Sequence, residues 1–330
     1  MDKKKKWTFY EKRRKFRLFY FHKIIERHIC NRCFNHDPIM LIYANRFTWG
    51  KKKTNQWIAD KIKSGQPFMV GRFGNTELSV MTSVLKRRLF GNTPEVKERF
   101  DKWFYRLGEL SGFFPNNPDL AEEFTDLMLD CCKDIDLLGM YHCDMDDYVI
   151  TEYMKNVKLT HLNFLEPWRY KGEPWSAALK GKKVLVIHPF DTSIQEQYSR
   201  RELLFPGTDI LPEFELKTLK AVQTIAGEID DRFATWFEAL DYMYEKAMEI
   251  DFDIAIVGCG AYGMPLAAKI KRAGKQAIHF GGVTQILFGI KGRRWIDNTR
   301  SQVEFNDAWV YPDESEKPKN SSVVENNCYW

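Results

Sequence analysis

The strongest constraint on the fold is a series of short apolar runs that alternate with segments of helical periodicity. Strand-like runs occur at 67–71 (PFMVG), 134–140 (DIDLLGM), 162–167 (LNFLEP), 180–190 (KGKKVLVIHPF), 251–258 (DFDIAIVG) and 275–282 (KQAIHFGG). Helical spacing covers 56–65, 76–89, much of 95–133, 233–250 and 263–274. Apolar strands separated by helices are typical of a parallel sheet covered on both faces. The sequence therefore predicts an α/β fold with a Rossmann-like, mostly parallel sheet.

Charge divides the chain into a basic arm and a more acidic body. Residues 1–28 contain eleven Lys or Arg against three Asp or Glu, whereas the whole chain has a net charge of +5, so the remainder is net negative. We expect a basic, aromatic N-terminal arm (1–50), an α/β body (51–311) and a polar tail (312–330) whose composition favours disorder. A net-negative body argues against a nucleic-acid-binding domain, whose positive charge should line the fold itself.

The basic arm has two interpretations of equal weight. Its alternation of cations and aromatic rings over residues 1–28 suits a segment that lies on an anionic membrane surface. It equally suits a helix that docks its aromatic side chains on the body, and RNA binding by the arm ranks third. Further along, His28, Cys30, Cys33 and His36 have metal-ligand residue types. Four ligands within nine residues are cramped for zinc, so we interpret these cysteines as packed.

Cellular context follows from what the sequence lacks. No run of about eighteen apolar residues predicts a membrane-spanning helix, and charges interrupt the N-terminal apolar residues, unlike a secretory signal. The seven cysteines are odd in number and include the adjacent pair Cys131 and Cys132, which does not suggest a disulfide framework. We expect a cytoplasmic protein whose arm allows peripheral association with the inner face of the cell membrane.

A glycine-rich turn follows the strand-like run at 251–258. The sequence GCGAYG places Gly258, Gly260, Tyr262 and Gly263 between a predicted strand and a predicted helix, where backbone N–H groups bind phosphates. A dinucleotide site also needs an acidic residue about twenty positions on. That position holds His279, which favours a different phosphate-bearing ligand over NAD. The alternative interpretation is a tight turn that lets helix and strand pack closely.

Two further predicted strands deliver polar residues to the same edge of the sheet. Gly281, Gly282 and Gln285 follow the strand-like run at 275–282, and ligands bind beyond the carboxyl ends of strands in open α/β sheets. Arg293 and Arg294 come shortly afterwards, and guanidinium groups match phosphate oxygens; a solvated cationic patch is the alternative.

The predicted strand at 180–190 ends in His188, and Asp191 follows. Either side chain is a candidate general base at the rim of the sheet. Both are equally consistent with capping a loop or a helix.

The stretch VGRFGNTELSV carries the remaining candidates. It places Arg72, Gly74, Asn75 and Glu77 where a predicted strand leads into a predicted helix. One interpretation is an ion pair between Arg72 and Glu77 that caps the helix, with Asn75 as N-cap. The other is a binding site for a charged ligand.

Together with the glycine-rich turn, GRFGNTE resembles the glycosyltransferases of the GT-D fold, over residues 66–295. Those enzymes carry an Arg-Phe-Gly-Asp-x-Glu stretch, which Arg72, Phe73, Gly74 and Glu77 match. The resemblance implies that Glu77 and the residue at position 75 face a divalent cation, Mn²⁺ or Mg²⁺, and the diphosphate of a nucleotide sugar. Asn75 replaces the aspartate, so the cation should be held more weakly.

We therefore predict a glycosyltransferase that uses a nucleoside-diphosphate sugar and a glycan or lipid-linked acceptor. Residues 174–190 and 257–282 also resemble uncharacterised proteins encoded with bacterial surface-polysaccharide genes. This resemblance implies a role in the synthesis of a bacterial surface polysaccharide or glycoconjugate. Glu77, with Asp191 or His188, is the expected catalytic set. Two alternatives are a dinucleotide-dependent oxidoreductase or epimerase, and a non-catalytic scaffold that binds the nucleotide sugar.

Overall fold

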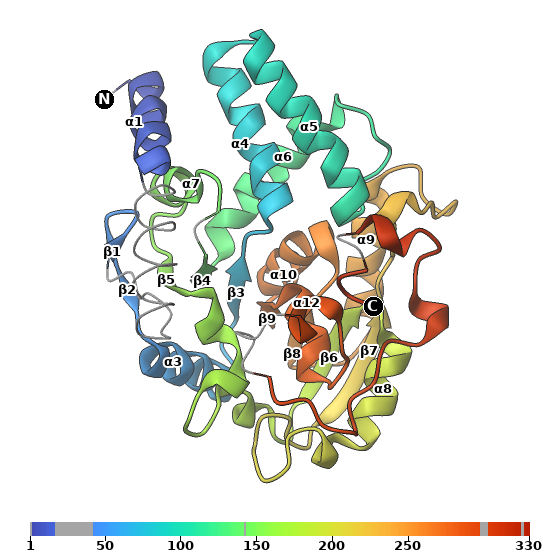
Figure 1. Cartoon of the computed structure of the whole chain (residues 1–330). Coiled ribbons are helices and arrows are strands. Elements are labelled where there is room, and N and C mark those ends of the chain that lie inside the picture. The colour runs from blue at the N-terminus through green and yellow to red at the C-terminus, as the bar shows by residue number, and fades with distance from the viewer. Residues whose placement is uncertain (1, 17–41, 142, 298–302, 325–326) are drawn as a thin grey trace.

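The computed structural model describes residues 2–16, 42–141, 143–297, 303–324 and 327–330. Within them the fold is a nine-stranded sheet with helices on both faces (Figure 1). In sheet order the strands are β1 (Ile42–Tyr43), β2 (Arg46–Trp49), β5 (Lys158–His161), β4 (Leu137–Met140), β3 (Phe68–Arg72), β9 (Gln276–His279), β8 (Ile254–Val257), β6 (Lys183–His188) and β7 (Glu215–Lys220). β1 is antiparallel to β2, and every other described pairing is parallel. The predicted α/β class is confirmed.

The longer helices of the described chain are α1 (Lys3–Phe16), α3 (Lys51–Ser64), α4 (Asn75–Phe90), α5 (Pro94–Ser111), α6 (Leu120–Cys131), α7 (Asp146–Tyr153), α8 (Asp191–Ser199), α9 (Trp236–Met248) and α10 (Gly263–Arg272). Two single-turn helices, α11 (Thr284–Leu287) and α12 (Arg293–Ile296), follow β9. None of the described helices combines the length and apolar character needed to cross a bilayer.

Alternating side chains of the strands build two hydrophobic cores. In β6, Val184 and Val186 join the core shared with α3 and α8, whereas Leu185 and Ile187 join the core shared with α4, α6, α9 and α10. All four side chains are fully buried. Successive strand residues point to opposite faces, so a strand covered on both sides must be apolar throughout. This is why the apolar runs of the sequence predict the strands well.

One predicted strand lies in the wrong place. Residues 162–165 of the run LNFLEP form a short 3₁₀ helix, and the strand is the preceding segment, β5. β5 contains two cationic or imidazole side chains, Lys158 and His161, and only Leu159 and Thr160 are fully buried. The apolar pattern of residues 162–165 is therefore stronger than that of β5, and it placed the predicted strand too late in the sequence.

Both ends of the chain extend further into the fold than composition suggests. β1 and β2 lie within residues 1–50 and add to the sheet, and α1 packs its aromatic residues Trp7 and Tyr10 into the core. The expectation of a disordered tail also differs from the structure. Glu316 is buried and accepts hydrogen bonds from the N–H groups of Thr192 and Ser193 at the start of α8 (2.9 and 3.3 Å). A few specific contacts anchor the tail to the body, so its polar composition alone wrongly favours disorder.

Candidate functional site

A cavity of about 420 Å³ lies at the carboxyl ends of the central strands. The ends of β3, β9, β8 and β6 contribute Arg72, His279, Gly258 and His188. A pocket in this position is where open α/β sheets bind ligands. The predicted site residues that line it are Arg72, Gly74, Asn75, Glu77, His188, Gly258, Gly260, Tyr262, His279, Gly281, Gly282, Gln285 and Arg294. Residues from distant parts of the chain therefore share one cavity.

Three predicted site residues do not line the cavity. Asp191 is the first residue of α8, and its carboxylate lies 4.0 Å from the Lys220 ammonium. Arg293 is exposed on α12, with its guanidinium 4.0 Å from Asp297. Gly263 begins α10 and packs against His279 instead. The metal-like residues His28 to His36 lie outside the described residues.

The turn between β3 and α4 is built around the carboxylate of Glu77. Gly74, not Asn75, is the N-cap of α4, and it offers no side chain to the helix terminus. The Glu77 carboxylate folds back over that glycine: a Cβ on Gly74 would lie 1.8 Å from Glu77 Oε2. Glycine is therefore required at position 74. The carboxylate accepts hydrogen bonds from its own N–H and from Ser111, so it occupies the positive end of α4, where an acidic side chain is stabilising.

The electrostatics of Glu77 reflect opposing effects. Burial raises the pKa of Glu77 above its ordinary value, and the hydrogen bonds and the charge of Arg72 offset part of that rise. The Arg72 guanidinium lies over the Tyr141 ring, 5.9 Å from its centroid. Glu77 is the one acidic side chain among the described lining residues, and Arg72, Arg106 and Arg294 also line the cavity. Cationic side chains therefore outnumber acidic ones in the lining.

The oxygens available to a cation are few. Asn75 is the first residue of α4 and is exposed at the cavity, beside Glu77. No cluster of three His, Cys, Asp or Glu side chains suited to a metal ion exists among the described residues. Mg²⁺ is commonly held by one or two carboxylates together with substrate phosphates. The pair Glu77 and Asn75 fits a cation only in that form, with a ligand supplying the other oxygens.

The glycine-rich turn packs tightly against its neighbours. A Cβ on Gly258 would lie 2.5 Å from Thr284 Oγ1 and 2.8 Å from His188 Cδ2. A Cβ on Gly263 would lie 2.5 Å from the His279 ring. Gly260 has φ +56° and faces the backbone oxygen of Ser111. These glycines therefore satisfy the packing interpretation of the motif, while the short 3₁₀ turn Gly260–Tyr262 still presents its backbone at the cavity wall.

Two buried histidines stand at the ends of β6 and β9. Burial lowers the pKa of His188 to about 3, and burial with the nearby Arg72 charge lowers the pKa of His279 to about 3. Both imidazoles are therefore neutral. His188 Nδ1 accepts a hydrogen bond from the N–H of Phe190 (3.0 Å), so its remaining proton is on Nε2. In this tautomer His188 is a hydrogen-bond donor rather than a base.

Residues after β9 connect the cavity to the tail. Gly281 has φ +67°, and a Cβ there would lie 3.3 Å from the Arg72 side chain. Gln285 is fully buried and donates to the carbonyl oxygens of Lys291 (3.0 Å) and Tyr329 (3.1 Å). Arg294 donates to the Tyr329 hydroxyl (3.0 Å) and lies over that ring, 4.7 Å from its centroid. Tyr329 thus holds Arg294 at the cavity.

Sequence reasoning missed the two outer walls of the cavity. α5 supplies Trp103, Arg106 and Ser111, and the tail supplies Tyr329 and Trp330. α5 has the ordinary pattern of an amphipathic helix, with no motif at these residues. The signal that could have identified the tail is its aromatic pair, Tyr329 and Trp330, after a long polar stretch.

Comparison with known proteins gives one structural likeness. No family model matches the chain, and no curated protein matches it. Among solved structures, a domain of unknown function (DUF1792), solved with selenomethionine, is similar at 12% sequence identity with a TM-score of 0.36. The likeness covers 78% of this chain and 96% of that domain.

Proposed function

We propose that this cavity binds a nucleoside-diphosphate sugar and transfers its sugar to an acceptor hydroxyl. The observation that supports the proposal most is the charge of the cavity. The described lining contains three arginines and the turn Gly260–Tyr262, against a single acidic side chain, Glu77. Arginine forks and backbone N–H groups are the groups that bind diphosphates. The earlier resemblance of GRFGNTE to GT-D glycosyltransferases points to the same ligand.

The chemistry assigns a role to each side of the cavity. In the transfer, the acceptor oxygen bonds to the anomeric carbon, the bond from that carbon to the diphosphate breaks, and the nucleoside diphosphate leaves. Arg72 and Arg294 stabilise the charge that develops on the leaving diphosphate. His188 donates a hydrogen bond from its Nε2–H group to a phosphate oxygen and keeps its proton. The proton of the acceptor hydroxyl goes to Glu77, whose raised pKa suits a general base. Glu77 replaces the two bases expected from the sequence, because Asp191 does not line the cavity and Nδ1 of His188 already accepts a hydrogen bond.

The same carboxylate has a second use. With Asn75 it would hold a divalent cation against the phosphates, and such a cation would neutralise part of the diphosphate charge. The two uses differ in one measurement. Transfer that persists in EDTA supports Glu77 as base, and transfer lost in EDTA and restored by Mn²⁺ supports the cation.

The test is Glu77→Gln, with Asp191→Asn as matched control. Glutamine keeps an oxygen that accepts from the helix N-terminus and Ser111, so the fold should persist, but it can neither take a proton nor neutralise a cation. We expect transfer to fall by about 100-fold or more, while the control, whose carboxylate lies outside the cavity lining, keeps full activity. Full transfer by Glu77→Gln would contradict the assignment.

A non-catalytic scaffold is the second candidate, and one observation favours it. The Glu77 carboxylate already accepts two hydrogen bonds within the protein, as expected of a structural cap. Tight binding of a nucleotide sugar with no transfer and no hydrolysis would support the scaffold. An NAD-dependent enzyme gains no support, because β9 ends in the buried, neutral His279, which packs against Gly263.

A further inference from the structure

The N-terminal helix α1 is fixed to the body by one face. Trp7 and Tyr10 are 1% and 4% exposed. Both rings make edge contacts with Tyr148 of α7, with centroids 4.8 and 5.7 Å apart. Two large aromatic side chains buried on one face of a short helix hold it more firmly than helix propensity alone can. In Figure 1, α1 accordingly stands beside α7 and α4 at the periphery of the molecule.

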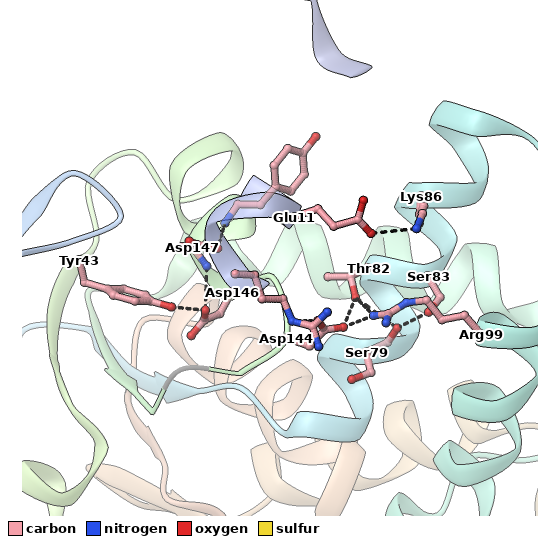
Figure 2. A network of polar contacts seen from close by, with 12 residues as sticks. Glu11, Tyr43, Ser79, Thr82, Ser83, Lys86, Arg99, Asp144, Asp146 and Asp147 are labelled. Atoms are coloured by element: carbon pink, nitrogen blue, oxygen red, sulfur yellow. Dashed lines mark hydrogen bonds and ion pairs between the residues drawn. The ribbon is translucent and has the colours of Figure 1, made fainter. Parts of the chain in front are cut away.

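Ion pairs around the buried rings fix the rotation of the helix. Lys6 pairs with Glu152 at 3.1 Å, and Arg14 Nε lies 2.7 Å from the buried carboxylate of Asp144. Asp144 also contacts Arg99 of α5. Figure 2 shows the contact between Asp144 and Arg99, together with the pair between Glu11 of α1 and Lys86 of α4 (2.8 Å). The acidic side chain of α1 therefore lies on its docked side.

The opposite face of α1 is cationic and aromatic. Lys5, Phe9, Lys12 and Phe16 follow one another at intervals of four, three and four residues, which places them along one side of a helix. Phe9 and Phe16 are 53% and 65% exposed, and the two lysines are exposed as well. We call these four residues the outer stripe. Aromatic rings interleaved with lysines along one exposed helix face are typical of helices that lie on membrane surfaces.

We propose that the outer stripe docks the protein onto an anionic membrane surface. The docked helix exposes what an interfacial helix needs: aromatic rings that enter the headgroup region and lysines that contact anionic lipids. The body beyond residue 28 is net negative, so an anionic surface attracts this end of the molecule in preference to the rest. Trp7 and Tyr10 stay buried in the protein. The proposal is independent of the ligand in the cavity.

The experiment measures binding of the full chain to sucrose-loaded vesicles by co-sedimentation. Vesicles contain either phosphatidylcholine alone or phosphatidylcholine with phosphatidylserine. We expect binding to the anionic vesicles only, weakened by salt. The variant Lys5→Gln/Lys12→Gln should bind about 25-fold more weakly, since each lysine near the surface contributes about fivefold. Phe9→Ser should weaken binding without changing its salt dependence.

The matched control is Lys63→Gln/Lys180→Gln, which removes the same charge from exposed sites away from α1. It should bind like the unmodified protein. Equal loss in both lysine pairs would overturn the proposal, because binding would then follow net charge alone. No binding to anionic vesicles, or binding to RNA oligonucleotides in their place, would also overturn it.

Discussion

The substitution Gly263→Ala tests whether the glycine-rich turn needs glycine at position 263 for close packing. Gly263 is the first residue of α10 and has a normal helical backbone, with φ −59° and ψ −46°. Alanine is favoured over glycine in a helix by up to about 1 kcal/mol. In open space the substitution should therefore stabilise the protein. Any loss of stability must come from what the new methyl group meets.

That methyl group meets a buried ring. A Cβ at position 263 would lie 2.5 Å from both Cδ2 and Nε2 of His279, which is 6% exposed and cannot move into solvent. Overpacking a well-packed core typically costs about 1–3 kcal/mol. Because 2.5 Å is far too short for a carbon contact, the upper part of that range applies, about 2–3 kcal/mol. After subtraction of a helix gain of about 1 kcal/mol, we expect Gly263→Ala to lower the free energy of unfolding by about 1–2 kcal/mol.

The assay is urea unfolding followed by far-UV circular dichroism, repeated in the His279→Ala background. Removing the ring opens the space that the methyl group needs, so there Gly263→Ala should become neutral or stabilising. The coupling energy of the cycle should be about 1–3 kcal/mol. Unchanged or increased stability of the single variant would refute the reasoning. So would an equal loss in both backgrounds.

Three further results are expected. The buried histidines His188 and His279 have pKa values of about 3 in the fold, against about 6.5 in the unfolded chain. Below pH 6.5 the unfolded chain therefore binds more protons than the folded protein. The free energy of unfolding should fall as the pH drops from 6.5 towards 3, by up to about 1.4 kcal/mol per pH unit per histidine. Thermal unfolding in matched buffers checks this, and a slope unchanged by His188→Gln would contradict it. Glu316→Ala leaves two backbone N–H groups of α8 without their acceptor, so it should cost about 1–3 kcal/mol and expose the tail to limited proteolysis. Tyr329→Phe removes the hydroxyl that accepts from Arg294 and keeps the ring, so nucleotide affinity should fall by about 5- to 10-fold in titration calorimetry, with stability little changed.

Local pattern was sufficient to predict the central sheet. The runs that became β3, β4, β6, β8 and β9 are buried on both faces, so each has an uninterrupted apolar stretch that is visible in the sequence, with polar residues only at the strand ends. The edge strand β7 has no fully buried side chain and mixes charged, polar and apolar residues, and we did not predict it. Edge strands therefore carry a weaker signal than central strands.

The candidate site was predictable where residues follow strand ends. Arg72, His188, Gly258 and His279 sit at the ends of parallel strands, which topology brings to one edge. Arg106 could not be predicted in this way, because it lies on α5 and does not follow a strand. The amphipathic pattern of α5 indicates which helix face is buried, but not that Arg106 lines a cavity.

The details of individual roles depend on three-dimensional contacts. Asn75 has the residue type of an N-cap, but the carboxylate of Glu77 folds over Gly74 and serves the helix terminus instead. His188 has the residue type of a base, but the N–H of Phe190 fixes its tautomer. Such assignments need the positions of neighbouring backbone groups, which a sequence does not specify.

The most direct test of a nucleotide-sugar cavity is a thermal-shift screen of the full chain. The panel contains UDP, GDP, CDP, their sugars and NAD, each with and without Mn²⁺, and each repeated on Arg72→Gln. We predict that one nucleoside diphosphate and its sugars raise the melting temperature, since ligands of the native state stabilise it by mass action. The variant should lose that shift. No shift with any nucleoside diphosphate, a shift with NAD alone, or a shift that persists in Arg72→Gln would contradict the account.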